Sequence, residues 1–187
     1  KRDFDFSSQV SSEILAKDIE PFLCERLDSY KLIFINGVFN KSLSILDSNE
    51  KFFVGSLKEG MKEMPDIINA HYAKLADTKQ SLVALNTAMA NEGAFVYVKK
   101  GVKLDKLVQI LFVNTNHEES RMMQTRNLFV LEDFAEAQIF ERHQAFNQGH
   151  VFSNSVTESS VGNQANFKHF KLQNDLNSCS MIDSTFV

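Results

Sequence analysis

The sequence predicts a mainly β protein whose C-terminal half is a stack of parallel strands. Residues 93–187 hold short β-type runs separated by small turns, and no helical pattern interrupts them. The runs cover residues 95–98, 102–104, 108–113, 127–131, 138–143, 152–157, 166–172 and 178–187. A small residue returns before three runs, at Ala94, Ala137 and Ala165, which fits repeats of about 20–30 residues with one insertion. Because no such repeat can bury its own apolar face, the repeats are expected to stack as a parallel β-helix.

Charge and hydropathy exclude several classes of protein. The 187 residues carry 20 Lys and Arg against 24 Asp and Glu, a net charge of −4, which argues against a nucleic-acid binder. The longest apolar runs, such as residues 107–113, are far shorter than the roughly 20 residues that cross a bilayer. No charged-then-apolar signal segment opens the chain. We therefore expect a cytoplasmic protein with neither nucleic acid nor membrane as a partner.

The aromatic and cysteine content indicates a packed, reduced protein. With 17 Phe, 3 Tyr and no Trp, the rings favour a packed interior over a surface that stacks sugars or bases. Cys24 and Cys179 are far apart and show no CxxC spacing, so they are expected to be free thiols in a reducing compartment. Cys24 lies among apolar residues and is best interpreted as a small buried hydrophobe.

Residues 1–54 are expected to begin irregularly and then form a helix and a hairpin. Residues 1–8 show no periodic signal, whereas Ser12 can cap a helix to residue 27 in which Pro21 begins a second turn. The strand-like runs 30–36 and 38–43 flank Asn36-Gly37, the dipeptide that most readily forms a tight antiparallel hairpin. A short strand is expected at residues 52–54.

Short helices are predicted between this hairpin and the strand stack. Ser56 and Glu59 form a capping box for a helix that ends near residue 63. Pro65 suits the first position of an amphipathic helix that ends near residue 77, and a third helix covers residues 81–90. The predicted domains are thus a small α+β segment, residues 1–92, and a β core, residues 93–187. Within the core, the polar residues 114–126 are expected to be a surface loop.

Several sequence blocks, in the same order, resemble the SufD branch of the SufB/SufD family. The blocks are GSLKEGMKEMPDIINAHYAKLAD (55–77), ALNTAMANEGAFVYVKKGVKLDKLVQILFV (84–113), RNLFVLEDFAEAQIFE (126–141), VTESSVGNQANFKHFKLQ (156–173) and SMIDSTFV (180–187). The similarity covers nearly all of the sequence from Tyr30 onward. A family member is described as a right-handed parallel β-helix flanked by helical segments, which agrees with the strand stack predicted above.

The resemblance implies a non-catalytic scaffold subunit of the SUF iron–sulfur cluster assembly machine. Its expected partners are a SufB-like subunit and a SufC-like ATPase, and a homodimer is the alternative when the partner is absent. The family's complex handles an iron–sulfur cluster and uses ATP through the ATPase subunit, so no cofactor is expected in this chain alone. The family's ATPase-contacting helices and its histidine-bearing region near the proposed cluster site lie beyond residue 187. The core is therefore expected to be incomplete, and no residue is assigned to either site.

Histidines and one cysteine of the predicted core are the candidate metal ligands. His143, His150 and His169 fall in or between predicted strands, and with Cys179 they supply borderline and soft donors of the kind that bind iron. The competing interpretation is that they are ordinary surface or turn residues. This competing interpretation is favoured because the sequence alone does not fix the strand register. The alternation of apolar and polar residues along the predicted strand also breaks at His169-Phe170.

The alternative function is a β-helix enzyme or binding protein that acts on polysaccharides. Such a protein needs clustered carboxylates and exposed aromatic rings, and the nearest cluster is Glu132, Asp133 and Glu136 at a predicted corner. A solvated turn is the favoured interpretation of these three residues. The sequence also has no GxxxxGK phosphate loop and no GxSxG nucleophile motif. We therefore expect a protein that is not an enzyme.

Overall fold

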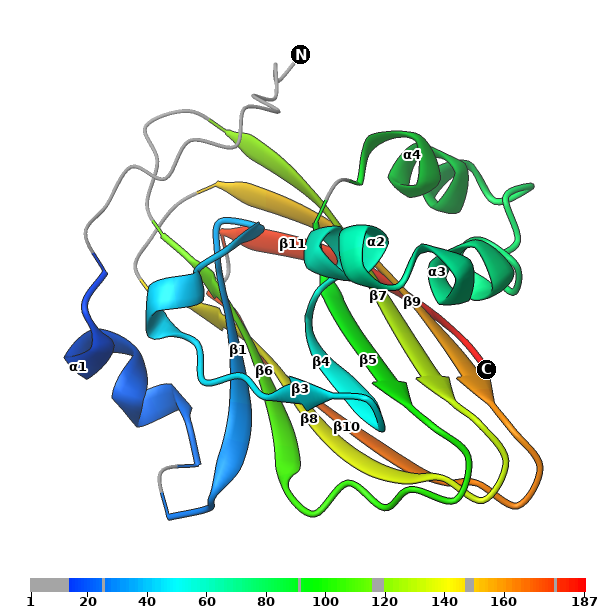
Figure 1. Ribbon diagram of the computed structural model, residues 1–187. Coiled ribbons are helices and arrows are strands. Elements are labelled where there is room, and N and C mark those ends of the chain that lie inside the picture. Colours follow the sequence, from blue (N-terminus) through cyan, green and yellow to red (C-terminus); the bar gives the residue numbers. More distant parts are fainter. Residues whose placement is uncertain (1–13, 25, 91, 116–119, 147–149, 177) are drawn as a thin grey trace.

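In the computed structural model, two β-sheets face each other with helices on their outer faces (Figure 1). The structure describes residues 14–24, 26–90, 92–115, 120–146, 150–176 and 178–187. Sheet A has the strand order β11 (Cys179–Phe186), β9 (Val151–Val161), β7 (Arg121–Leu131), β5 (Ala94–Val98), β4 (Phe52–Ser56), β3 (Ser48–Asn49). Sheet B has the order β10 (Asn166–Asn174), β8 (Glu136–Ala145), β6 (Leu107–Asn114), β1 (Ser29–Ile35), β2 (Val38–Phe39).

Successive strands from β5 to β11 alternate between the two sheets. Each pairs in parallel with the strand two places further along the chain, so that β6, β8 and β10 stack in sheet B while β5, β7, β9 and β11 stack in sheet A. Strand β1 also joins β6 in parallel, whereas β2, β3 and β4 pair antiparallel at the edges. We call a sheet B strand and the sheet A strand that follows it a rung. The predicted mainly β class is confirmed.

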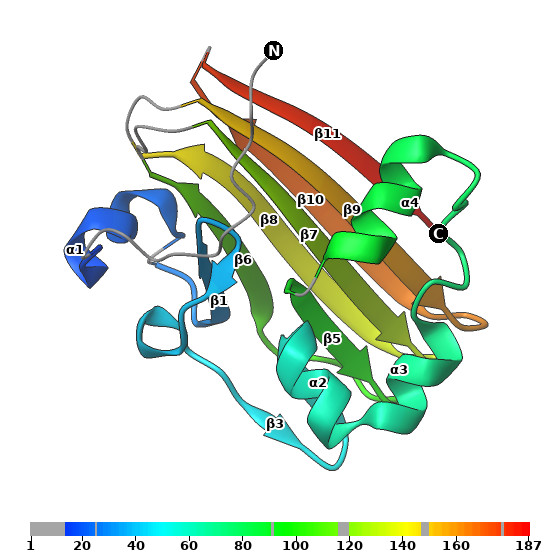
Figure 2. The same ribbon diagram turned by 90° about the horizontal axis from the view of Figure 1, so that it is seen from above.

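Short helices cover the outer faces of both sheets (Figure 2). They are α1 (Ala16–Ile19), η1 (Glu20–Phe22), η2 (Lys41–Leu43), α2 (Leu57–Glu63), α3 (Pro65–His71) and α4 (Ser81–Met89). Helices α2 and α3 pack through Leu57 and Ile68 on sheet A, and α1 packs through Ile19 on sheet B. The main core lies between the sheets. Among the described helices, none is long and apolar enough to cross a membrane.

The hairpin and the capping box are confirmed. Asn36 and Gly37 have φ angles of 52° and 77°, the left-handed pair that a tight hairpin turn requires, and Ile35 pairs with Val38. The second strand is shorter than predicted, because η2 replaces it from Lys41 onward. At the start of α2 the Ser56 hydroxyl accepts from the Glu59 amide at 3.1 Å.

Two predicted helices are shorter in the structure. The cap residue Ser12 lies outside the described residues, and the helix predicted to residue 27 is only α1 and η1, since Pro21 prevents the α-helix from continuing. Helix α3 ends at His71 rather than near residue 77, because Ala73 adopts a positive φ of 55°. The Ala73 amide is hydrogen-bonded to Glu158, in a strand far along the chain.

Two further predictions for the core are wrong. Residues 102–104 are not a strand; Lys103 forms only an isolated bridge with Glu136, within a long crossing from sheet A to sheet B. The described part of the polar run 114–126 is not a loop throughout, because β7 begins at Arg121. Polar residues were expected at the surface, but Arg126 is fully buried.

The corners that join β5, β7 and β9 to sheet B share one backbone feature. The third residue after each of these strands has a positive φ: 70° at Gly101, 60° at Phe134 and 55° at Gln164. Asp133 links two corners, because its Oδ1 atom accepts from the Asn163 amide at 2.9 Å. Glu132 accepts from the Lys100 amide at 2.9 Å. These hydrogen bonds fix the position of each corner on the next.

Gly93 lies where the helical segment meets the sheet. A Cβ atom at this position would collide with the Arg126 carbonyl in β7. The close approach lets the Leu57 amide donate to the Gly93 carbonyl at 2.7 Å and so attaches α2 to the sheet. Only glycine allows two backbones to come this close.

We expect Gly93→Ala to lower the free energy of unfolding by about 3 kcal/mol or more, because backbone atoms must move to admit the methyl group. Gly101→Ala is the matched control, since it strains a positive φ but meets no heavy atom within 4 Å, and it should cost about 1 kcal/mol. Urea unfolding of both variants tests this. Equal losses would contradict the close approach.

Candidate functional site: a charged interior

The space between the sheets changes from apolar to charged along the strand stack. In sheet B, one column of inward-facing register partners comprises Leu32, Ile110, Glu141 and Lys171. The two columns beside it comprise Phe34, Phe112, His143 and Gln173, and Tyr30, Val108, Ile139 and His169. Each column is apolar through β6 and becomes polar in β8 or β10. The polar side chains therefore gather in the last two rungs.

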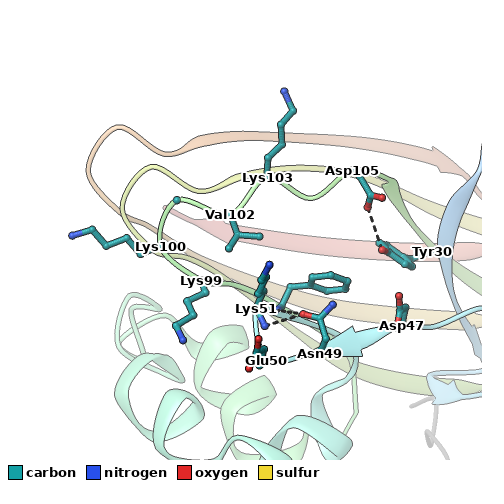
Figure 3. A pocket seen from close by; sticks show the side chains of 12 residues that line it. Tyr30, Asp47, Asn49, Glu50, Lys51, Lys99, Lys100, Val102, Lys103 and Asp105 are labelled. Carbon is teal, nitrogen blue, oxygen red and sulfur yellow. Dashed lines mark hydrogen bonds between the residues drawn. The ribbon is translucent and has the colours of Figure 1, made fainter.

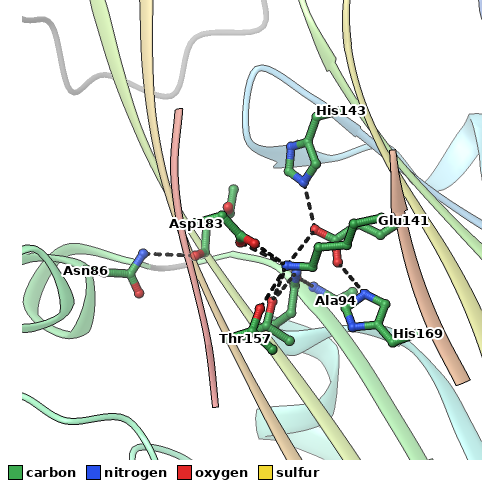
Figure 4. Close-up of polar contacts among 11 residues, drawn as sticks. Asn86, Ala94, Glu141, His143, Thr157, His169 and Asp183 are labelled. Atoms are coloured by element: carbon green, nitrogen blue, oxygen red, sulfur yellow. Dashed lines mark hydrogen bonds and ion pairs between the residues drawn. The ribbon is translucent and has the colours of Figure 1, made fainter. Parts of the chain in front are cut away.

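Glu141 is the centre of the charged interior (Figure 4). Its side chain is fully buried, and each carboxylate oxygen contacts one imidazole: Oε1 is 2.7 Å from His143 Nε2, and Oε2 is 2.8 Å from His169 Nε2. His143 lies two residues further along β8, and His169 comes from the neighbouring strand β10. The carboxylate thus bridges two adjacent strands.

Lys171 connects this cluster with sheet A. Its Nζ atom is 3.6 Å from Glu141 Oε1, donates to Thr157 in β9 at 3.3 Å, and lies 2.8 Å from Asp183 in β11. In Figure 4 these groups converge from both sheets. The ammonium group thus lies between the Glu141 and Asp183 carboxylates and attracts both. The side chains of Lys171 and Asp183 are 24% and 28% exposed, so this end of the cluster opens towards solvent.

His143 also ends a stack of aromatic rings. The rings of Phe34 and Phe112 are 4.7 Å apart between centroids, and those of Phe112 and His143 are 4.8 Å apart. The three residues are register partners in β1, β6 and β8. The same position therefore packs the apolar interior and carries a hydrogen bond to Glu141.

Hydrogen bonding keeps the buried carboxylate ionised. Burial acts to raise the pKa of Glu141, but hydrogen bonds from His143 and His169 and the positive charge of Lys171 outweigh it and hold this pKa well below its ordinary value. An ionised carboxylate at this position accepts hydrogen bonds without giving any. The site is accordingly a tightly bonded ionic cluster.

The structure brings together two of the four predicted ligands. His143 and His169 meet on Glu141, whereas His150 is exposed just before β9 and Cys179 begins β11 beside Val151. Burial, followed by the charge of Asp175, raises the pKa of the Cys179 thiol, which disfavours the thiolate that binds metals. Among the described residues, no group of three or more acidic, histidine or cysteine side chains is arranged to hold a metal ion.

A second buried ion pair lies on the outer face of sheet A. Arg126 in β7 and Glu158 in β9 are both fully buried, with Arg126 Nε 3.2 Å from Glu158 Oε2. Glu158 also accepts from the amides of Ala73, Leu75 and Ala76 at 2.8–3.0 Å. This pair attaches the segment between α3 and α4 to the sheet. This pair is not predicted from the sequence, although a lone Arg beside apolar residues in a strand-like run is a usable signal.

A hollow of about 800 Å³ lies beside Tyr30 and Phe52 (Figure 3). Charged residues of both signs surround it: Asp47, Glu50, Lys51, Lys99, Lys100, Lys103 and Asp105. Burial and the hydrogen bond to Asp105 raise the pKa of Tyr30 to about 12. Lys100 and Lys103 extend away from the hollow and pair with Asp133 and Glu136. Because the charges are mixed, the hollow offers no surface of one sign to a ligand.

Two regions of one known protein family together match almost the whole chain. The SufBD protein N-terminal region matches residues 1–110, and the SufBD core domain of the SUF system for FeS cluster assembly matches residues 112–187. The stacked β-sheet architecture thus belongs to a protein class concerned with iron–sulfur cluster assembly. The chain is a member of the SufBD family, as the sequence resemblance indicates.

Two relatives of the chain are named as iron–sulfur cluster assembly proteins. The iron–sulfur cluster assembly SufBD family protein slr0076 of Synechocystis is 25% identical over 99% of this chain and 42% of its own length. The iron–sulfur cluster assembly protein SufB of Bacillus subtilis is 34% identical over 43% of this chain and 17% of its own length. The chain therefore spans less than half the length of these relatives.

We expect Glu158→Gln to lower the free energy of unfolding by about 3–5 kcal/mol, because it leaves the Arg126 charge buried without its partner. Glu59→Gln is the control, since it disturbs an ion pair whose Lys41 partner is 77% exposed, and it should cost under about 1 kcal/mol. Chemical denaturation at pH 7 compares the two. A small loss for Glu158→Gln would show that the pair does not attach the helices.

Glu141→Gln should change how stability depends on pH. Since the folded-state pKa of Glu141 is lowered, its ionised form stabilises the protein above the unfolded-state pKa, about 4.3, and this contribution is lost as the pH falls. The variant should be less stable than wild type by about 2–3 kcal/mol at pH 7, with the gap narrowing below about pH 5. The control is Glu136→Gln, which disturbs an exposed ion pair. The free energy of unfolding of both variants and of the wild type is measured from pH 3 to 8. A gap that does not change with pH would contradict an ionised Glu141.

Proposed function

We propose that this chain is the N-terminal part of a scaffold subunit of the SufD branch, which pairs with a SufB-like subunit and works with a SufC-like ATPase. The observation that carries the proposal is the match of both SufBD family regions, in order, along the chain. The ordered blocks between residues 55 and 187 support the SufD branch. In such a complex the iron–sulfur cluster is the product, and ATP is used by the ATPase subunit.

We also propose that the two sheets are faces of a right-handed parallel β-helix. Support comes from the alternation of strands β5 to β11 between the sheets, and from a repeat in which 30 residues separate the register partners Ile139 and His169. Right-handed crossings between parallel strands are strongly preferred in proteins. A stiff stack of this kind suits a scaffold, because the position of each rung is fixed by the one before it.

The subunit is proposed to be non-catalytic and to work in the cytoplasm. Its most buried charges, on Glu141 and Glu158, are already neutralised by partners within the chain. The corner carboxylates that a polysaccharide enzyme would use are also engaged, since Glu132 and Asp133 accept hydrogen bonds from neighbouring turns. Cys24 and Cys179 are reduced cysteines rather than halves of a disulfide, which suits a reducing compartment.

The test is co-purification of the complete protein with its proposed partners. An affinity-tagged form, co-expressed with SufB-like and SufC-like subunits, should retain both in a complex of fixed stoichiometry after size exclusion. The same tagged protein expressed with the SufC-like ATPase alone, and an unrelated tagged protein, are the controls. A homodimer that excludes the SufB-like subunit, or cleavage of acidic polysaccharides by the purified protein, would contradict the proposal.

A further inference from the structure

The inner face of β9 carries hydroxyl groups that the described protein atoms do not satisfy. Ser155 and Ser159 are 0% and 1% exposed, and neither hydroxyl has a hydrogen-bond partner among the described residues. The same holds for Thr125, the register partner of Ser155 in β7, which is 2% exposed. Leaving a buried hydroxyl unpaired costs about 1–3 kcal/mol. Such groups in native proteins are bonded to protein atoms or to ordered water.

Strand geometry directs these hydroxyls into the charged interior. Thr157 faces the interior, because its hydroxyl accepts from Lys171 Nζ. Ser155 and Ser159 lie two residues to either side of it in β9 and therefore share its face. The three hydroxyls form a polar row opposite Glu141.

Neighbouring contacts place the ends of this row beside the charged groups. Ser155 is the register partner of Asp183, which binds Lys171 at 2.8 Å. Ser159 is the register partner of Phe129, whose ring centroid is 5.2 Å from that of His169. The unpaired hydroxyls thus border the ionic cluster on both sides.

We infer that ordered water lies along the inner face of β9 and joins the hydroxyls of Thr125, Ser155 and Ser159 to the ionic cluster of Glu141, His143 and His169. Water is the ligand that fits, because it can donate to the carboxylate and both donate to and accept from hydroxyls. A metal cation is disfavoured by the ammonium group of Lys171, 3.6 Å from the carboxylate. Polar sites with two to four partners are those that retain buried water.

Such water would give each of these buried hydroxyls a hydrogen-bond partner and would extend the polar network of the cluster along β9. This inference rests on the hydroxyls and the ionic cluster alone, so it does not depend on the proposed partners.

The first test compares Ser159→Ala with the matched control Ser160→Ala in the complete protein. Ser160 is the next residue of β9 and faces the opposite side of the sheet. If water binds the Ser159 hydroxyl, Ser159→Ala should raise the equilibrium constant for unfolding about fivefold. Ser160→Ala should raise it less than twofold. A Ser159→Ala variant as stable as the control, or more stable, would overturn the inference, because removing an unpaired hydroxyl from a dry site carries no loss.

The second test detects the water directly. Nuclear Overhauser effects between water and side-chain methyl groups should appear at Thr125 and Thr157 in the folded protein. Val96, in the apolar part of the interior and fully buried, is the control and should show none. The absence of water signals at both threonines would show a dry interior and overturn the inference, whether or not the protein binds SUF partners.

Discussion

In-register pairing of parallel strands is the constraint on which the rest of this structure depends. Backbone hydrogen bonds fix which residue of one strand lies beside which residue of the next, and side chains alternate between the two faces. A shift of β8 by one residue would turn Glu141 to the outer face of sheet B and bring Phe140 into the interior. The aromatic stack, the charged interior and the attachment of the helices therefore all follow from one register.

Two buried carboxylates use this register in different ways. Glu141 faces inward and joins β8 to β10 through His169, whereas Glu158 faces outward and attaches the segment after α3 to sheet A. Burying either charge is unfavourable unless every oxygen is bonded, and both carboxylates meet that condition. These charges thus add to apolar contacts that join the same parts of the chain, such as the packing of Ala76 on Val156 and of Phe167 on the main core. Fixed relative positions of this kind are what the proposed scaffold role requires.

The sequence predicted local features well where one residue type determines the backbone. Asn36-Gly37 and the Ser56 capping box were predicted correctly, as were most strands, because turn and cap chemistry is local. Arg126 was assigned to a loop, since its partner Glu158 is distant in sequence and only the fold brings them together. His143 and His169 were candidates, but their shared partner Glu141 could not be identified without the register. The predicted domain boundary between residues 92 and 93 stays a prediction. Strands β1 and β4 precede that boundary and pair with β6 and β5 of the predicted core.

A double-mutant cycle between Glu141→Gln and His169→Gln tests most directly whether this carboxylate joins the last two rungs. Free energies of unfolding of the wild type, both single variants and the double variant give the coupling between the two side chains. The account predicts a coupling of about 1.5–3 kcal/mol at pH 7, the range for a hydrogen bond to a charged group in a buried site. Additive effects, with a coupling below about 0.3 kcal/mol, would contradict it.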